Sequence, residues 1–280
     1  MAIVLALGAA AFYGSADFMG GIAARRNAAI TVALGAQLAG LTVLLLALPL
    51  LGSTSVVPAD MVLGGIAGVF GAVGIVTIYR ALARGPMSVV APASALSASA
   101  VPVLAGLVMG ERPGVQALLG IVVALGAVVL ITREHGDGVA RPARSVLAAV
   151  GPALAGGAVF GLFFVALHQT GDAAGAWPLV AARMVSVPLL ASMVLVRRAQ
   201  VDWDPRMVGA LLVSGLLDMV ANLLYLVAVR HGMLAVVSAL TGLYPASTVV
   251  LAQTRLGERM QPAQFAGLGV AAVAAVMVAA

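Results

Sequence analysis

About ten apolar runs, each long enough to cross a bilayer as a helix, follow one another along this chain with short polar or Gly/Pro breaks between them. A membrane-spanning helix needs about 20 predominantly apolar residues, and inside lipid every backbone polar group must be satisfied within the structure. Runs of this length therefore predict helices, and the breaks predict short loops. We expect spans over residues 3–22, 30–51, 61–81, 86–108, 114–132, 147–168, 177–196, 207–228, 233–254 and 262–280.

The charge content supports lipid as the solvent of this chain. Charged residues make up only 9% of the sequence and hydrophobic residues 62%, whereas a soluble domain carries about 25% charged residues. The net charge of +5 comes from basic residues scattered through short loops, so it does not indicate a nucleic-acid partner. Cysteine is absent, and the sequence predicts neither a metal site nor a cofactor. The expected fold class is an all-α polytopic membrane protein.

The two halves of the sequence repeat each other. Residues 61–87 align without a gap with residues 207–233, so that Tyr79 matches Tyr225. We therefore expect a first repeat over 1–132, a polar linker over 133–146 and a second repeat over 147–280. Five spans per repeat is an odd number, so the second repeat must cross the membrane in the opposite sense. Inverted repeats of this kind are a recurring plan of secondary transporters, with the substrate site between them.

The second half carries a recognisable series of residues, Gly215, Asn222, Tyr225, Arg230, Tyr244-Pro245 and Gly257-Glu258-Arg259. This series resembles the EamA repeat of the drug/metabolite transporter superfamily, and the resemblance covers nearly the whole chain as two units. It implies about ten helices in two inverted five-helix repeats, a central cavity, and transport of small polar metabolites, often amino acids or related compounds. The first half departs from the pattern, with Ala98 in place of Pro245 and Tyr13-Gly14 where many members have Trp-Gly.

Ionisable residues inside spans are costly to insert and by default suggest function. Asp17, Arg183 and Asp218 are the main examples. Asp218, Asn222 and Tyr225 share one helical face, and Asp218 either binds an amine or a proton or forms a structural pair with Arg183. Arg183 needs an anion, which a substrate carboxylate, Asp17 or Asp218 would supply. Tyr13 lies one turn before Asp17 and joins it as a candidate.

Two further spans combine hydroxyl groups with proline. Pro245 accompanies Thr241, Tyr244 and Thr248 in the ninth span, while Pro92 and Pro102 accompany Ser94 and Ser97 in the fourth. Proline removes a backbone hydrogen bond and kinks a helix, so these positions are expected to expose carbonyl groups near the cavity. The alternative is that these residues only pack helices together, as Ser, Thr and Pro commonly do in membranes.

The distribution of arginine predicts an orientation. Arginines concentrate in the loops after odd-numbered spans, whereas Arg112 and Arg230 lie on the opposite side. The positive-inside rule then places the odd-numbered loops in the cytoplasm and both termini outside the inner membrane. The family resemblance implies the opposite orientation for many members, so the two predictions differ.

Taken together, these features predict a secondary transporter of a small polar metabolite, an amino acid or related compound, working by alternating access. Export is expected rather than import, and proton coupling and substrate exchange both stay open. One alternative is an exporter of lipophilic cations; another is an intramembrane enzyme or lipid-handling protein, which would need a pair such as His168 with a carboxylate. No metalloprotease or P-loop motif is present, so no enzyme is expected. The expected partners are a small-molecule substrate, the lipid bilayer and protons, for a monomer or homodimer.

Overall fold

The computed structural model describes residues 1–51, 55–85, 87–131, 143–199, 204–256 and 262–279. Within these ranges every regular element is a helix, which confirms the all-α fold. The α-helices are α1 (Ala2–Ala24), α2 (Ala29–Ala47), α3 (Pro58–Arg84), α4 (Met87–Val108), α5 (Val115–Ile131), α6 (Ala143–His168), α7 (Trp177–Arg197), α8 (Pro205–Arg230), α9 (Leu234–Thr241), α10 (Pro245–Leu256) and α11 (Pro262–Ala279), and the short 3₁₀ helices are η1 (Leu48–Leu50) and η2 (Asp172–Ala174).

Two features expected from the sequence fall wholly or partly outside the described residues. The Gly257-Glu258-Arg259 motif lies outside them, as does the linker up to residue 142. The remaining linker residues, 143–146, form the first turn of α6. The second repeat therefore begins its first helix earlier than predicted.

Eight helical segments of the described chain are long and apolar enough to cross a membrane, with α9 and α10 together forming one of them. The helices α5 and α11 contain shorter apolar stretches, Val115–Ala127 and Phe265–Met277. These segments correspond to the spans expected from the sequence. The chain is a multi-pass membrane protein.

Proline and glycine set several helix boundaries. Pro58, Pro205 and Pro262 open α3, α8 and α11, where the missing N–H would have no intrahelical partner and the fixed φ suits the first turn. Just after the C-terminal end of α4, Gly110 has a φ of 95°. Glycine adopts this left-handed conformation without strain and so closes the helix.

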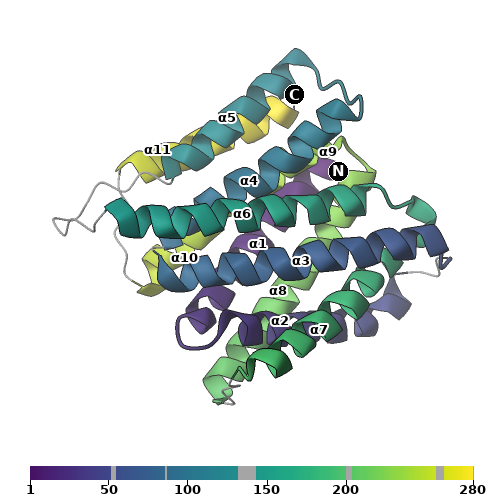
Figure 1. The fold of residues 1–280 in the computed structure, drawn as a ribbon. Coiled ribbons are helices and arrows are strands. Elements are labelled where there is room, and N and C mark those ends of the chain that lie inside the picture. The colour runs from purple at the N-terminus through teal and green to yellow at the C-terminus, as the bar shows by residue number, and fades with distance from the viewer. Residues whose placement is uncertain (52–54, 86, 132–142, 200–203, 257–261, 280) are drawn as a thin grey trace.

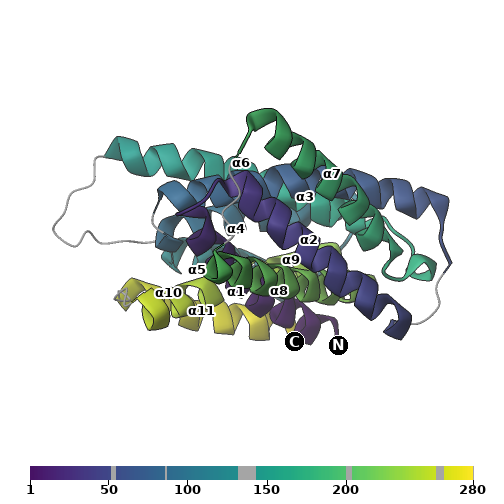
Figure 2. The ribbon, with the colours of Figure 1, turned by 90° about the horizontal axis from the view of Figure 1, so that it is seen from below.

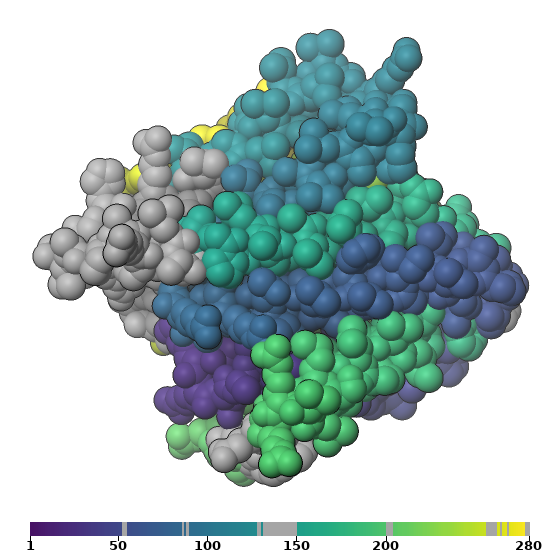
Figure 3. Space-filling view, in the orientation of Figure 1, coloured from purple at the N-terminus to yellow at the C-terminus, as the bar shows by residue number. Residues whose placement is uncertain are grey.

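The outer surface of the bundle is apolar. Along α3, the exposed residues Val62, Ile66, Val69 and Val73 follow one another at helical spacing. Such a stripe facing water would be unfavourable, but facing lipid tails it costs nothing. Figure 3 shows α3 and α6 side by side on one outer face, with α7 beneath α3.

The two halves interlock instead of forming separate bodies. The helix α1 of the first half packs along α8 of the second, and α3 packs along α6. Figure 2 shows α2 crossing between α7 and α8, while α5 lies beside α11 at one edge (Figure 1). Both termini lie at the end of the bundle where α4 leads into α5 (Figure 1), as an even number of spans requires. Each half therefore buries its helices mainly against the other.

Close packing between α3 and α7 depends on glycine. A Cβ at Gly64 or Gly68 would lie within about 2.9 Å of backbone atoms of Pro178 or Ala182 on α7. No real Cβ approaches backbone atoms so closely, so the two helices can touch only because these positions lack one. Small residues serve this purpose widely in membrane helix pairs. The contact brings α7, which carries Arg183, against the core of the bundle.

The ninth predicted span is divided. We expected one helix over 233–254, whereas the structure ends α9 at Thr241 and begins α10 at Pro245. Pro245 has no N–H to donate to a carbonyl of the preceding turn. Just before it, the backbone forms hydrogen bonds that reach back three residues instead of four, as where Tyr244 N donates to the Thr241 carbonyl at 3.1 Å.

The carboxylate of Glu111 caps the N-terminus of α9. It accepts from Leu234 N at 2.5 Å and from Ala235 N at 2.9 Å. Glu111 lies between α4 and α5 of the first half, yet it satisfies free N–H groups of a helix in the other half, where the helix dipole favours negative charge.

Candidate functional site

Arg183 and Asp218 meet in the interior of the bundle. Arg183 lies on α7 and Asp218 lies in the middle of α8, and Nη2 of the arginine donates to Oδ2 of the aspartate at 2.5 Å. The two side chains are 6% and 17% exposed. An isolated charge at this depth would cost about 2.5–3.5 kcal/mol on insertion scales. The pair therefore neutralises two costly charges contributed by α7 and α8, which are consecutive in the chain.

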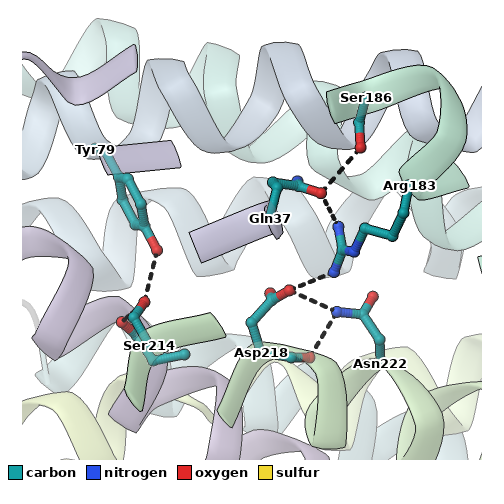
Figure 4. Close-up of polar contacts among 8 residues, drawn as sticks. Gln37, Tyr79, Arg183, Ser186, Ser214, Asp218 and Asn222 are labelled. Atoms are coloured by element: carbon teal, nitrogen blue, oxygen red, sulfur yellow. Dashed lines mark hydrogen bonds and ion pairs between the residues drawn. The ribbon is translucent and has the colours of Figure 1, made fainter. Parts of the chain in front are cut away.

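Gln37 on α2 is the third member of the cluster. Its Oε1 accepts from Arg183 Nη1 and, at 2.9 Å, from Ser186 Oγ (Figure 4). The sequence analysis missed Gln37. A signal was present, because Gln37 and Arg183 are 146 residues apart, which is the spacing of the internal repeat. The two residues thus occupy equivalent positions in the two halves and meet where the halves meet.

Asn222 extends the cluster along α8. Its Nδ2 donates to the Asp218 carboxylate at 3.1 Å and to the Asp218 carbonyl at 2.6 Å. Two polar atoms of the cluster stay unsatisfied among the described residues, namely Asn222 Oδ1 and Arg183 Nε. Unpaired buried polar atoms are unfavourable. The cluster therefore retains one spare donor and one spare acceptor.

A second hydrogen-bonded group lies beside this cluster (Figure 4). The hydroxyls of Tyr79 on α3 and Ser214 on α8 are 3.2 Å apart, and Ser214 Oγ donates to the Ala16 carbonyl of α1 at 3.0 Å. Tyr225, the repeat partner of Tyr79, makes the corresponding contact with Ser238 at 3.0 Å. Both tyrosines thus hold helices together through a serine, and Tyr79 also lines the cavity.

A small cavity lies directly against the charged cluster. Its free space accommodates about one water molecule, so the helices are closed around it. The wall combines charged and polar residues with apolar ones. The lining residues are Ala33, Ala36, Gln37, Gly71, Ile75, Tyr79, Phe160, Phe163, Arg183, Asp218 and Asn222.

Aromatic rings form a continuous group next to the cavity. The ring of Tyr13 stands edge-on to Phe160 and Phe164, with centroids 6.2 Å and 5.7 Å apart, and Phe164 lies 4.1 Å from Tyr225. Edge-to-face pairs of this kind add packing energy beyond burial. The Tyr13 hydroxyl has no hydrogen-bond partner among the described residues.

Asp17 lies on α1 near the cluster but outside the cavity wall. It is 8% exposed, and among the described residues no hydrogen bond or ion pair engages its carboxylate. Its charge is close enough to that of Asp218 for the two to interact. Of these two aspartates, Asp218 is the one that Arg183 contacts among the described residues.

The hydroxyl-bearing candidates of the fourth and ninth spans lie between helices. Thr241 and Thr248 donate to the carbonyls of Ala6 and Gly14 on α1, at 3.5 Å and 2.9 Å. Ser94 and Tyr244 pair with each other at 3.1 Å, and Ser97 donates to the Ser94 carbonyl at 3.1 Å. The part of the cavity wall that the structure describes includes none of these five polar side chains. Their observed contacts are those of the helix-packing alternative.

The prolines of the fourth span lie inside α4, which continues through both Pro92 and Pro102. Pro102 cannot donate to the Ala98 carbonyl. That carbonyl faces Gly161 of α6, where an added Cβ would lie 3.1 Å away. The freed oxygen thus lies against α6.

The fold defines a class, the multi-pass helical membrane proteins built from two interlocking halves. The model of the EamA-like transporter family matches residues 1–133 and 147–280. The chain belongs to this family, and so to the drug/metabolite transporter superfamily of membrane transporters.

Solved structures agree on the fold. One, described as "Crystal structure of protein", is 17% identical with a TM-score of 0.68, and the match covers 99% of this chain and 95% of the other. At that identity the likeness shows the fold alone. No curated protein matches the chain.

Proposed function

We propose that this protein is a secondary carrier that moves a small polar metabolite, an amino acid or related compound, by alternating access between its two halves. The observation that carries the proposal is the Arg183–Asp218 pair in the wall of a buried cavity, with Gln37 and Asn222 beside it. A buried ion pair often stabilises a protein no better than apolar residues of similar volume. A charged pair beside a cavity at the interface of the halves is therefore better explained by substrate binding.

The direction that we propose is export. The membrane that we propose is the inner membrane, with the odd-numbered loops cytoplasmic and both termini outside, because the arginines concentrate in those loops.

We assign proton coupling to Asp17. Asp218 is held by Arg183, whereas Asp17 is buried without a cationic partner among the described residues. A carboxylate that no cation neutralises is cheaper to bury as the acid, and an intramembrane carboxylate of this kind is a recurring proton carrier.

The lipophilic-cation alternative keeps one supporting observation. It predicts an accessible carboxylate without a nearby arginine. Asp17 meets the second condition, because it has no cationic partner among the described residues, but it is only 8% exposed. Inhibition of transport by quaternary ammonium dyes would favour this alternative. The enzyme alternative required His168 within reach of a carboxylate, and no such bond or ion pair occurs among the described residues.

The test is flux in proteoliposomes that hold the purified protein, with a pooled panel of labelled amino acids and amines and an imposed pH gradient. Movement of one compound above the level in protein-free liposomes is expected. Arg183→Gln should abolish that movement, whereas Ser192→Ala should not, because among the described residues the Ser192 hydroxyl bonds only to the Leu189 carbonyl on its own helix. Equal flux in wild type and Arg183→Gln would contradict the proposed site.

A further inference from the structure

We propose that the Arg183–Asp218 pair is itself the recognition element, and that the substrate is a zwitterion whose carboxylate and ammonium groups lie close together. On binding, the substrate carboxylate replaces Asp218 on the guanidinium of Arg183, and the substrate ammonium replaces the guanidinium on Asp218. This inference rests on the proposed function, because it assigns the substrate of the same site.

The first argument is the position of the two unsatisfied atoms. Arg183 Nε and Asn222 Oδ1 are buried without a partner among the described residues, and both side chains line the cavity. Nε and Nη2 form the side-on edge of a guanidinium that binds a carboxylate through two parallel hydrogen bonds. Nη2 is now taken by Asp218. A substrate carboxylate on that edge would satisfy Nε and release Asp218.

The second argument concerns the other half of the substrate. Once released, the Asp218 carboxylate and the free Asn222 Oδ1 are two acceptors on one face of α8, one turn apart. An ammonium group offers three donors and a positive charge. Gln37 keeps its bond to Nη1 of Arg183 in this arrangement, so the guanidinium stays oriented while its partner changes.

Charge balance then separates the classes of substrate. The cavity wall holds one positive and one negative residue among its described members, so a zwitterion leaves every charge paired. A simple amine would leave Arg183 unpaired, and a simple carboxylate would leave Asp218 unpaired, at a depth where unpaired charge is costly. Asp17, the other charged group nearby, does not line the cavity. The apolar residues of the wall, among them Ala33, Ile75 and Phe163, are suited to contact an apolar side chain.

The internal pair also accounts for the closed cavity. Without substrate the two charges neutralise each other, so α7 and α8 can close on an empty site that holds no unpaired charge. The carrier can therefore return empty, and net transport does not require a second substrate molecule on the way back.

The experiment uses the absence of cysteine in the chain. A single cysteine in the cavity wall, Ile75→Cys, becomes the only thiol, and its labelling by N-ethylmaleimide reports opening and occupancy of the cavity. Cysteine is smaller than isoleucine, so the change introduces no clash. Ala36→Cys, also in the wall, provides a second position. The common amino acids are tested one at a time for slowing of the labelling.

The amino acid that protects best is then compared with its own decarboxylated amine and its own 2-hydroxy acid. We expect each analogue to protect about tenfold less well or worse, because each leaves one buried charge unpaired. In Asp218→Asn the 2-hydroxy acid should protect better than the amino acid, and in Arg183→Gln the amine should. The double variant should lose both preferences, and its labelling without ligand shows that the cavity still forms and opens.

Three outcomes would overturn the inference. One is that no amino acid slows labelling of an accessible cysteine; another is that an analogue protects as well as its parent in the wild type. The third is that the order of protection stays the same in both charge variants. By contrast, a cysteine that is never labelled at either position would mean that the cavity does not open, which would refute the proposed transport site itself.

Discussion

Arg183 is oriented by partners from two other helices. Gln37 on α2 accepts from Nη1 and Asp218 on α8 accepts from Nη2, so the plane of the guanidinium is set on both sides. Ser186, one turn after Arg183 on α7, in turn donates to Gln37 at 2.9 Å. At this scale Gln37 acts as a positioning residue. It touches no expected substrate group but determines which edge of the guanidinium faces the cavity.

Replacement of Gln37 tests this positioning role. Gln37→Ala should weaken protection of Ile75→Cys by amino acids about tenfold, because Arg183 loses a hydrogen bond worth about 1.5 kcal/mol or more to a charged group. The apparent affinity should change while the maximal extent of protection does not. Thr42→Ala on the same helix is the control, because within the described ranges the Thr42 hydroxyl bonds only to the Leu38 carbonyl of its own helix. An unchanged affinity in Gln37→Ala would exclude the positioning role.

Asp17 is the residue on which proton coupling depends in our proposal. Asp17→Asn should abolish the extra accumulation that a pH gradient drives in proteoliposomes, while exchange of labelled for unlabelled substrate at equal pH continues. The amide resembles the protonated acid in size and polarity but cannot release a proton. Asp172→Asn serves as the control, because that carboxylate lies at the surface with 82% of its side chain exposed. Gradient-driven accumulation that survives in Asp17→Asn would place coupling elsewhere.

At the scale of the elements, the bundle depends on helices that approach more closely than side chains normally allow. The α3–α7 contact is the clearest case, because Gly64 and Gly68 lie against the backbone of α7. The same helix, α7, presents Arg183 to the cavity. Spacing between these helices therefore affects both stability and the position of the charged cluster.

A pair of glycine substitutions separates the effect of spacing from that of helix propensity. In Gly68→Ala the new Cβ would lie too close to the backbone of Ala182, so we expect a loss of about 1–3 kcal/mol in unfolding free energy from overpacking. In Gly209→Ala on α8 the new Cβ meets nothing within 4 Å, so stability should be equal or slightly higher, since alanine favours a helix. Thermal unfolding in detergent measures both. Equal stability of the two variants would contradict the close approach.

At the scale of the whole molecule, most of the close helix–helix contacts join one half of the chain to the other. The pairs α1 with α8 and α3 with α6 each join one helix from either half, and Glu111 of the first half caps α9 of the second. The site follows the same rule, with Gln37 from one half and Arg183 and Asp218 from the other. Neither half alone contains the complete cluster.

Expression of the halves as separate chains tests this interdependence. Residues 1–132 or 147–280 alone should give aggregated protein in detergent, because the faces of α1 and α3 that contact the other half would lack their partners. Co-expression should give a single complex that elutes like the intact chain, as assessed by size-exclusion chromatography. A half that is monodisperse alone would show that the repeats fold independently.

The sequence by itself determined the all-α fold, the approximate number and positions of the spans, the repeat and the family. These properties depend on local quantities, because the apolar length of a segment fixes whether it can cross a membrane. The cost of a charge in lipid also singled out Arg183 and Asp218 in advance. Only the tertiary structure decided that these two residues pair, that Gln37 joins them, and that Thr241 and Thr248 contact α1. Such contacts depend on the rotation and depth of each helix against partners distant in sequence, and the packing of the whole bundle sets both.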